Sequence, residues 1–342
     1  MKLDEIVKFI QQHFTDGLVL VIGSGLSCAE GLPGMPQLAE HLKSSASELK
    51  DEDAKRWAQI QRDLDSNQGL EAALLKYQPT PTLEAWIVRQ TCSLLLPKER
   101  EIITAVVRGN QILRLTTFLN KQLRPPNGLP VLTPNYDRLV EVACEMAGFH
   151  VDTTAIGQYA GTFDPNRSAM ASSRGIVNRG RNPMIDHYPR AVVLKPHGSL
   201  DWFKNAQGPM RCCIEIEAER LVITPGLNKY RAGYDSPFDK HREIANEHIN
   251  RCARLLVIGY GFNDDHLQNH LVSKIKAGTP TLILTRTASQ AARKLAQDSP
   301  QCVCLSRPDK QPGLQIMKGK SILEIPKPEL WDLAILTKEL LS

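Results

Sequence analysis

The chain has 342 residues, of which 42% are hydrophobic and 23% are charged, with 22 Gly and 22 Pro. This composition is typical of a soluble globular protein and excludes a disordered, fibrous or collagen-like chain. A net charge of +5, from 42 basic and 37 acidic residues, is too small to indicate a nucleic-acid-binding protein, so we do not expect direct binding of nucleic acid.

The first elements in chain order are a predicted helix and a buried strand. The helix is predicted from apolar residues at helical spacing, Leu3, Ile6, Val7, Ile10 and Phe14. The strand is predicted from the apolar run Leu-Val-Leu-Val-Ile at 18–22. Further short apolar strands are predicted at 130–132, 191–194, 221–223, 255–258 and 281–284. Because helical patterns separate many of these two-sided apolar strands, the sequence predicts a doubly wound parallel α/β sheet.

Residues 46–124 are different, because they are charged and poor in strands. They predict a helical module inserted into the α/β domain, with breaks at the prolines. We expect its helices at 50–65, 70–77, 83–95 and 102–123, with breaks at Pro79, Pro81 and Pro97.

Residues 157–190 are rich in Gly, Ser, Asn and Arg, show little periodicity and are too long for an ordinary loop. We expect this segment to close over a ligand, to bind a partner or to be solvated. The tail, 306–342, predicts a strand at 322–325 and a mostly apolar helix at 328–341. Such a helix must be buried, either in its own subunit or in a subunit contact.

These patterns predict three parts of the chain. Residues 1–45 and 125–305 form the α/β domain, 46–124 the inserted helical module, and 306–342 a C-terminal tail with a helix. The apolar runs are far shorter than the roughly 20 residues that cross a bilayer, and 1–10 lack a signal-peptide pattern, so we expect a cytoplasmic protein without a membrane segment. The eight cysteines show no repeating frame, which predicts reduced core residues.

The first strand ends in Gly-Ser-Gly-Leu-Ser at 23–27, followed by Gly-Leu-Pro at 31–33. Two glycines let the backbone approach a phosphate, and Ser27 can cap a helix whose N-terminus favours anions. A dehydrogenase fingerprint would need a third glycine where the chain has Cys28. We interpret the loop as a diphosphate-binding loop, with a tight turn as the alternative, and we expect Cys28 to be buried in the core.

Three more polar motifs follow predicted strands, namely Thr-Pro-Asn-Tyr-Asp at 133–137, Lys-Pro-His-Gly-Ser at 195–199 and Val-Ile-Gly-Tyr-Gly-Phe-Asn-Asp-Asp at 257–265. The carboxyl ends of parallel strands face one crevice, so these motifs should converge. Asp137 is either part of a site or a helix N-cap, and His197 is either catalytic or structural. Trp202 either stacks on a base or fills the core.

In this order, the four motifs resemble the sirtuin superfamily, specifically its sirtuin-like NADase branch of bacterial anti-phage defence. The resemblance covers about half of the chain and implies a Rossmann-like sirtuin fold that binds NAD. It implies that Asn135 and Asp137 lie beside the nicotinamide ribose and that His197 is the catalytic histidine. It further implies two groups of NAD-binding residues: Gly23, Ser24, Gly25, Ser27 and Pro33 around the diphosphate, and Gly259, Gly261 and Asn263 around the adenosine half.

The chain departs from sirtuin deacylases in having no Cys-x-x-Cys pair, so we expect no zinc. His266 and His270 share a helix face but have no third ligand nearby, and we expect no metal there. The missing zinc ribbon favours a hydrolase over a deacylase.

We therefore predict an NAD glycohydrolase that consumes NAD as a substrate and releases nicotinamide and ADP-ribose. Asn135 would orient water, His197 would accept a proton, and Asp137 would orient the ribose or stabilise positive charge. The alternatives are an NAD-dependent protein deacylase, or a catalytically silent subunit that binds NAD or ADP-ribose or serves as a scaffold.

The resemblance also implies control of the activity, because a constitutive NADase would kill its host. We expect an abortive-infection effector that oligomerisation or a partner chain activates. The family implies a HerA-type ATPase or a nucleic-acid-guided protein as that partner, and we expect a homo-oligomer.

Overall fold

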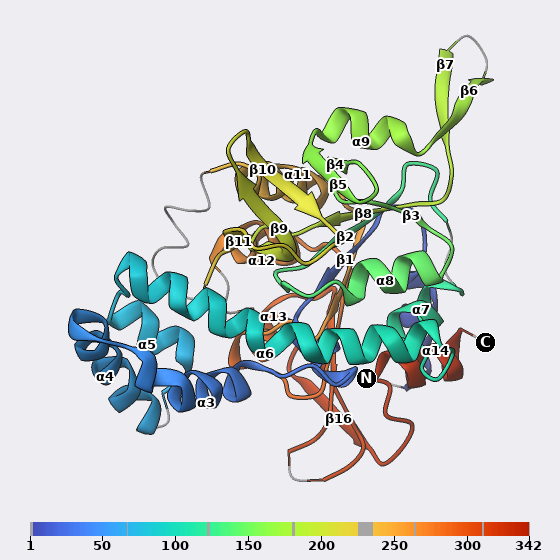
Figure 1. Ribbon diagram of the computed structural model, residues 1–342. Helices are drawn as coiled ribbons and strands as arrows, with labels where there is room; N and C mark the ends of the chain where they lie inside the picture. Colours follow the sequence, from blue (N-terminus) through green and yellow to red (C-terminus); the bar gives the residue numbers. More distant parts are fainter. Residues whose placement is uncertain are drawn as a thin grey trace.

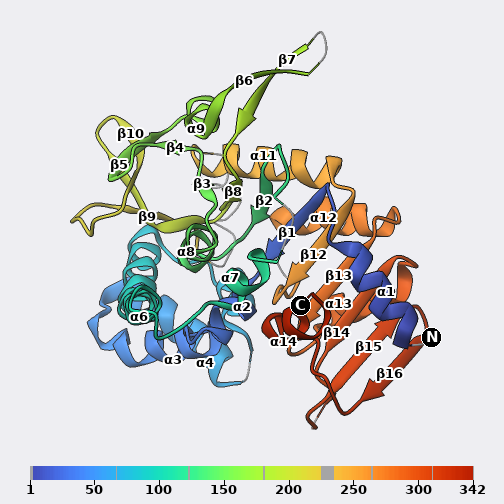
Figure 2. The ribbon, with the colours of Figure 1, turned by 90° about the vertical axis from the view of Figure 1, so that its right-hand side faces the viewer.

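The computed structural model describes residues 3–66, 68–121, 124–179, 182–224, 235–262, 265–309 and 311–341. Its largest element is a nine-stranded sheet with the order β16-β15-β14-β13-β12-β1-β2-β8-β3 (Figures 1 and 2). The parallel strands are β1 (Leu18–Ile22), β2 (Leu129–Leu132), β3 (His150–Asp152), β8 (Arg190–Leu194), β12 (Arg254–Ile258), β13 (Thr281–Thr285) and β14 (Cys302–Ser306). Antiparallel β15 (Leu314–Lys318) and β16 (Ser321–Ile325) extend one edge.

Helices cover both faces of this sheet, because its strands are apolar on both sides. In β1, Leu20 and Ile22 point into one core, whereas Val19 and Val21 point into the other. The first core is covered by α1 (Leu3–His13), α7 (Arg114–Leu119), α8 (Leu139–Met146) and α14 (Leu333–Leu340), and the second by α11 (Phe238–Arg251), α12 (Asp265–Lys276) and α13 (Gln290–Asp298). The predicted doubly wound α/β fold is confirmed.

The order of the strands reverses between β1 and β12. From β1 the sheet continues to β2 and β8 on one side, and from β12 it continues to β13 and β14 on the other. In doubly wound sheets, a crevice opens at the carboxyl ends of the strands at such a switch point. The first and fourth sequence motifs follow these two strands.

A set of helices before β2 has an apolar core of its own, which includes Leu42, Trp57, Ile60 and Leu83. These helices are α3 (Met35–Ser45), α4 (Asp51–Asp65), α5 (Leu70–Lys76) and α6 (Pro81–Val107) (Figure 1), with a short 3-10 helix η1 (Ala46–Glu48). The predicted break at Pro97 is wrong, because α6 continues through this proline. Buried residues on both sides of Pro97, Ile87 before it and Ile102 after it, hold the two halves in one helix.

Although its sequence shows little periodicity, much of the described part of the segment 157–190 forms regular elements. It contains α9 (Pro165–Ala171), and a hairpin of β6 (Ser173–Arg179) and β7 (Asn182–His187) projects from the body of the protein (Figures 1 and 2). A second sheet combines β4 (Ala155–Ile156), β5 (Ala160–Phe163), β9 (Gly198–Asn205), β10 (Gly208–Cys212) and β11 (Arg220–Val222). The strand predicted at 221–223 is therefore not part of the main sheet, because β11 pairs antiparallel with β9.

The C-terminal helix is shorter than predicted, because α14 begins at Leu333. The carboxylate of Asp332 caps it by accepting hydrogen bonds from the backbone N–H groups of Ala334 and Ile335. Leu333 and Leu336 are buried in the first core of the same chain. The tail helix therefore packs within its own subunit.

Six of the cysteines are buried, but Cys28 and Cys213 are exposed, so the prediction that all are core residues is wrong for these two. Cys28 lies inside α2 (Ser24–Ala29), and Cys213 directly follows β10. None of the helices in the described ranges has the length and apolar character needed to cross a bilayer.

Candidate active site

The loops after β1 and β12 cross at the switch point through three glycines. The N–H of Gly23 donates to the carbonyl of Ile258, and the N–H of Gly25 donates to that of Gly259, both at 2.9 Å. A Cβ on Gly23 would lie 2.4 Å from the Gly259 oxygen, and one on Gly259, whose φ is +60°, would lie 2.6 Å from the Leu26 nitrogen. Close backbone packing therefore requires these glycines. Their predicted contact with a diphosphate stays a prediction.

A cavity of about 250 Å³ opens beside this crossing. It brings together side chains from motifs that lie far apart in the sequence, including all three predicted catalytic residues. Its lining includes Ser24, Ser27, Pro33, Asn135, Asp137, His197, Tyr260 and Gly261. Gly23, Gly25 and Gly259 form the crossing next to it, and Asn263 lies outside the described residues.

Three of the lining side chains form one hydrogen-bonded chain. The Asn135 Nδ2 donates to the Ser27 Oγ at 3.0 Å, and this Oγ donates to the Asp137 Oδ2 at 2.9 Å. Ser27 lies inside α2 (Ser24–Ala29), whose N-cap is Gly23, so the prediction that Ser27 caps this helix is wrong. The serine instead links the loop after β1 to the loop after β2.

Asp137 lines the cavity and also contacts the start of α8, although the N-cap of this helix is Arg138, and its role in a site stays a prediction. Its Oδ1 accepts the N–H of Leu139 at 3.2 Å at the start of α8, while Oδ2 accepts from Ser27. Burial raises the pKa of Asp137 to about 6, against the opposing effects of the Lys195 cation and the Ser27 hydrogen bond. The carboxyl group therefore titrates just below neutral pH.

His197 is held by its backbone between the two sheets. Its carbonyl accepts the N–H of Ile223 at 2.9 Å, and Gly198 follows with a φ of +87°. A Cβ on Gly198 would lie 2.0 Å from the Leu221 oxygen, so only glycine permits this turn. The Tyr136 hydroxyl donates to the Ile223 carbonyl at 2.6 Å, which ties the loop after β2 to the same segment.

Two charged residues beneath the cavity were missed by sequence reasoning. Lys195 is 1% exposed, and its Nζ donates to the Asp137 carbonyl and to the Glu141 Oε1. Glu99 of α6 is 0% exposed and accepts the Nε of Arg138 at 3.0 Å. The position of Lys195, at the end of a buried strand, was a usable signal for burial, whereas nothing in the helical pattern distinguishes Glu99.

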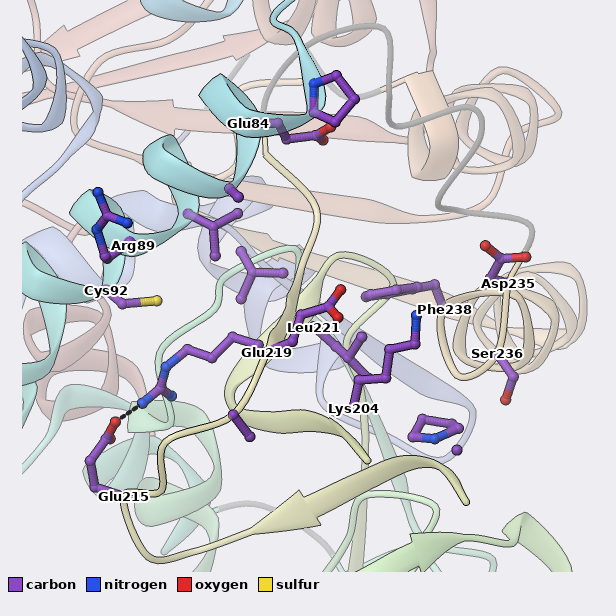
Figure 3. Close-up of a pocket in the computed structure, with 18 of the residues that line it drawn as sticks. Glu84, Arg89, Cys92, Lys204, Glu215, Glu219, Leu221, Asp235, Ser236 and Phe238 are labelled. Atoms are coloured by element: carbon purple, nitrogen blue, oxygen red, sulfur yellow. Dashed lines mark hydrogen bonds and ion pairs between the residues drawn. The ribbon is translucent and has the colours of Figure 1, made fainter. Parts of the chain in front are cut away.

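A larger cavity of about 800 Å³ lies between α6 and the second sheet (Figure 3). Arg220 and Glu215, which form an ion pair, both line it. Lys204, Glu219 and Leu221 extend into it from the sheet side (Figure 3). None of the predicted site residues that the structure describes lines it. We place the candidate site in the smaller cavity, because the strand-end motifs meet there.

The remaining candidates from the sequence have other surroundings. Trp202 is 1% exposed and packs against Phe163 and His241, so it fills the core of the second sheet. Partial burial and the nearby Asp137 carboxylate raise the pKa of the exposed Cys28 thiol. The His270 Nδ1 lies 3.5 Å from the Asn250 Oδ1, and the side chain of His266 is outside the description. The described residues contain no His, Cys, Asp and Glu group suited to a metal ion.

Comparisons with known proteins give one family and several distant structures. A search of curated proteins finds no match. The structures found include a Sir2 protein with a p53 peptide and NAD⁺ (10% identity, TM-score 0.41, covering 85% of this chain and 89% of that one). They also include a Sir2 homologue in complex with NAD (11% identity, TM-score 0.41, covering 100% and 93%).

The family model described as "SIR2-like domain" matches residues 130–302, half of the chain. The matched region contains the loops after β2, β8 and β12, and with them Asn135, Asp137 and His197. This chain belongs to the SIR2-like domain family.

Proposed function

We propose that this protein is an NAD glycohydrolase, which cleaves NAD to nicotinamide and ADP-ribose. The observation that carries the proposal is the meeting of His197 with the hydrogen-bonded Asn135, Ser27 and Asp137 in one cavity at the switch point. The size of the cavity, about 250 Å³, suits the nicotinamide riboside end of NAD better than the whole dinucleotide.

In the proposed reaction, the bond between nicotinamide and the ribose C1′ breaks, and its electron pair leaves with nicotinamide. A water oxygen then bonds to C1′ and loses one proton. His197 would accept that proton, or one from a ribose hydroxyl, as a general base. Because Asn135 is held by Ser27, its amide would present a fixed hydrogen-bonding group to the water.

The buried carboxylate of Asp137 supplies negative charge where the ribose becomes positive in the transition state. Such a charge acts strongly because little water screens it, and because Ser27 and the α8 backbone already hold it in place. The family membership supports the same kind of chemistry, since the SIR2-like match spans all three residues.

The test is chromatography of NAD incubated with the purified protein, comparing wild type with His197→Ala and Asn135→Ala. We expect nicotinamide release from the wild type and a loss of at least about 100-fold in turnover for each variant. If NAD stays intact when incubated alone, but an acyl-lysine peptide is deacylated when it is added with NAD, the result would favour the deacylase. Loss of folding in either variant, detected by its thermal midpoint, would assign that residue a structural role instead.

We also propose that the activity is controlled by assembly, as part of an abortive-infection response to phage. The activating contact would be a homo-oligomer or a partner chain of the HerA-type ATPase or nucleic-acid-guided class. Because α14 packs on α1 and α7 of its own chain, the interface would lie elsewhere. Light scattering with parallel NAD assays tests this, and a monomer with full activity would contradict it.

A further inference from the structure

We propose that Lys195 is a positioning residue of the candidate site, which holds the Asn135–Asp137 loop and the His197 loop in one arrangement through its buried ammonium group. The inference deepens the proposed function and rests on it for the identity of the reaction. The geometric part of the inference is independent of the proposed function.

The side chain of Lys195 bridges two loops and a helix. Lys195 follows β8 directly and lies two residues before His197. Its Nζ donates to the carbonyl of Asp137, to that of Tyr136 at 3.4 Å, and to the Glu141 Oε1 of α8 at 2.9 Å. The residue that carries the histidine loop is therefore bonded to the backbone of the loop that carries Asn135 and Asp137.

The backbone of Lys195 is fixed as well. Its N–H donates to the His241 Nδ1 at 3.1 Å, and the Nε2 of His241 lies 2.9 Å from the Thr154 Oγ1. Burial, with the Lys195 cation second, lowers the pKa of His241 to about 3, so His241 is neutral and its Nδ1 accepts. Lys195 is thus anchored at both its main chain and its ammonium group.

The contacts of the ammonium group compensate for the burial of this lysine. An ammonium ion removed from water is costly unless each N–H finds an acceptor, and the two carbonyls and one carboxylate provide three acceptors for three donors. A shift of the loop after β2 away from Lys195 would lengthen these hydrogen bonds. The ion pair therefore penalises displacement of Asn135 and Asp137 relative to His197.

The same ion pair also acts on the charge of Asp137. The groups around Asp137 are Lys195, Glu141 of α8, Glu99 of α6, the Cys28 thiol and the hydroxyl of Ser27. Lys195 lowers the pKa of Asp137, whereas Glu141 and Glu99 raise it. Lys195→Met and Glu141→Gln should therefore change this pKa in opposite directions, although each removes one half of the same ion pair.

The experiment measures the Asp137 titration by infrared spectroscopy of the carboxyl band, assigned with Asp137→Asn, in wild type, Lys195→Met and Glu141→Gln. The titration should move to higher pH in Lys195→Met and to lower pH in Glu141→Gln. For NAD cleavage, we expect Lys195→Met to lower kcat by about 10- to 100-fold, the scale for misplaced catalytic groups, with a smaller change in KM. Lys76→Met, which breaks the distant Lys76–Asp63 pair, is the matched control and should change neither quantity.

The outcomes separate this inference from the proposed function. If wild type releases no nicotinamide, the proposed function is wrong, but the two opposite titration shifts still test Lys195. Shifts in the same direction, or wild-type titration and kcat in Lys195→Met, would overturn the positioning role. Should Lys195→Met not fold, the nearly isosteric Glu141→Gln decides, because an unchanged titration and kcat there would contradict it.

Discussion

The loop after β2 buries polar side chains, whereas the β6–β7 hairpin exposes apolar side chains. The loop buries Asn135, Asp137 and, beside them, the cation of Lys195, and the described contacts pair each of them. The hairpin instead exposes apolar side chains on both strands, with Ile176 at 73% and Ile185 at 43%. Buried polar side chains are stable where hydrogen-bond partners satisfy them, whereas the exposed apolar side chains need no partner for the hairpin to form.

The largest expected effect is in the network beneath the loop. Arg138→Met removes the cation that faces the fully buried carboxylate of Glu99. Leaving one charge of a buried pair alone should lower the free energy of unfolding by about 3 kcal/mol or more, measured by urea denaturation. The control is Lys98→Met, which breaks an exposed pair with Glu101 and should cost less than about 0.5 kcal/mol. Equal effects would show that burial does not distinguish the two pairs.

A smaller loss is expected where the glycine loops cross. Gly259→Ala adds a Cβ that would lie 2.6 Å from the Leu26 nitrogen, at a φ of +60°. We expect about 2 to 4 kcal/mol lower stability from strain and overpacking together. Gly319→Ala, at a φ of +56° with no atom within 4 Å, isolates the conformational part and should cost about 1 to 2 kcal/mol. A similar loss in both variants would contradict the tight crossing.

The pH dependence of stability tests the burial of Asp137. Its ordinary pKa of 3.8 is raised to about 6 in the folded protein, so between these values the folded state binds more protons than the unfolded state. The contribution of Asp137 to stability therefore falls as pH rises through this window and is constant above it. The thermal midpoint of Asp137→Asn relative to wild type should increase from pH 4 to pH 6. A constant difference would mean that the pKa is not raised.

The smallest effect is expected in the hairpin. Ile176→Ser combined with Ile185→Ser changes a cross-strand pair that is exposed to solvent, so stability should change by less than about 0.5 kcal/mol. Calorimetry checks this against Ile22→Val, a fully buried residue of β1, which should cost about 1 kcal/mol. A loss in the hairpin variant equal to that of Ile22→Val would show that the hairpin packs against something in solution.

The same contrast explains what the sequence could predict. The strands β1, β8, β12 and β13 were predictable because residues apolar on both faces have few other places to lie. The hairpin strands were not, because Gly175, Asn178 and Pro183 interrupt their pattern, and pairing between neighbours stabilises them instead. The continuous α6 was missed because packing on both sides of Pro97 outweighs the local cost of a proline.

At the site, sequence motifs located Asn135, Asp137 and His197 in one cavity because strand ends meet at the switch point. The supporting charges were harder to predict. Glu99 and Lys195 are residue types that normally lie on the surface, and only the three-dimensional structure shows the acceptors and donors that make their burial favourable.

The contact of α14 with α1 and α7 has a consequence for the synthesis of the protein. Leu333 and Leu336 pack in the same core as Ile6 and Ile10, so this face of the sheet is closed by residues that precede β1 and residues that follow β16. A ribosome that has translated only as far as β14 would therefore hold a chain in which α1 and α7 lack their contact with α14. Contacts this distant in sequence form late, so this core should close only after α14 has left the exit tunnel.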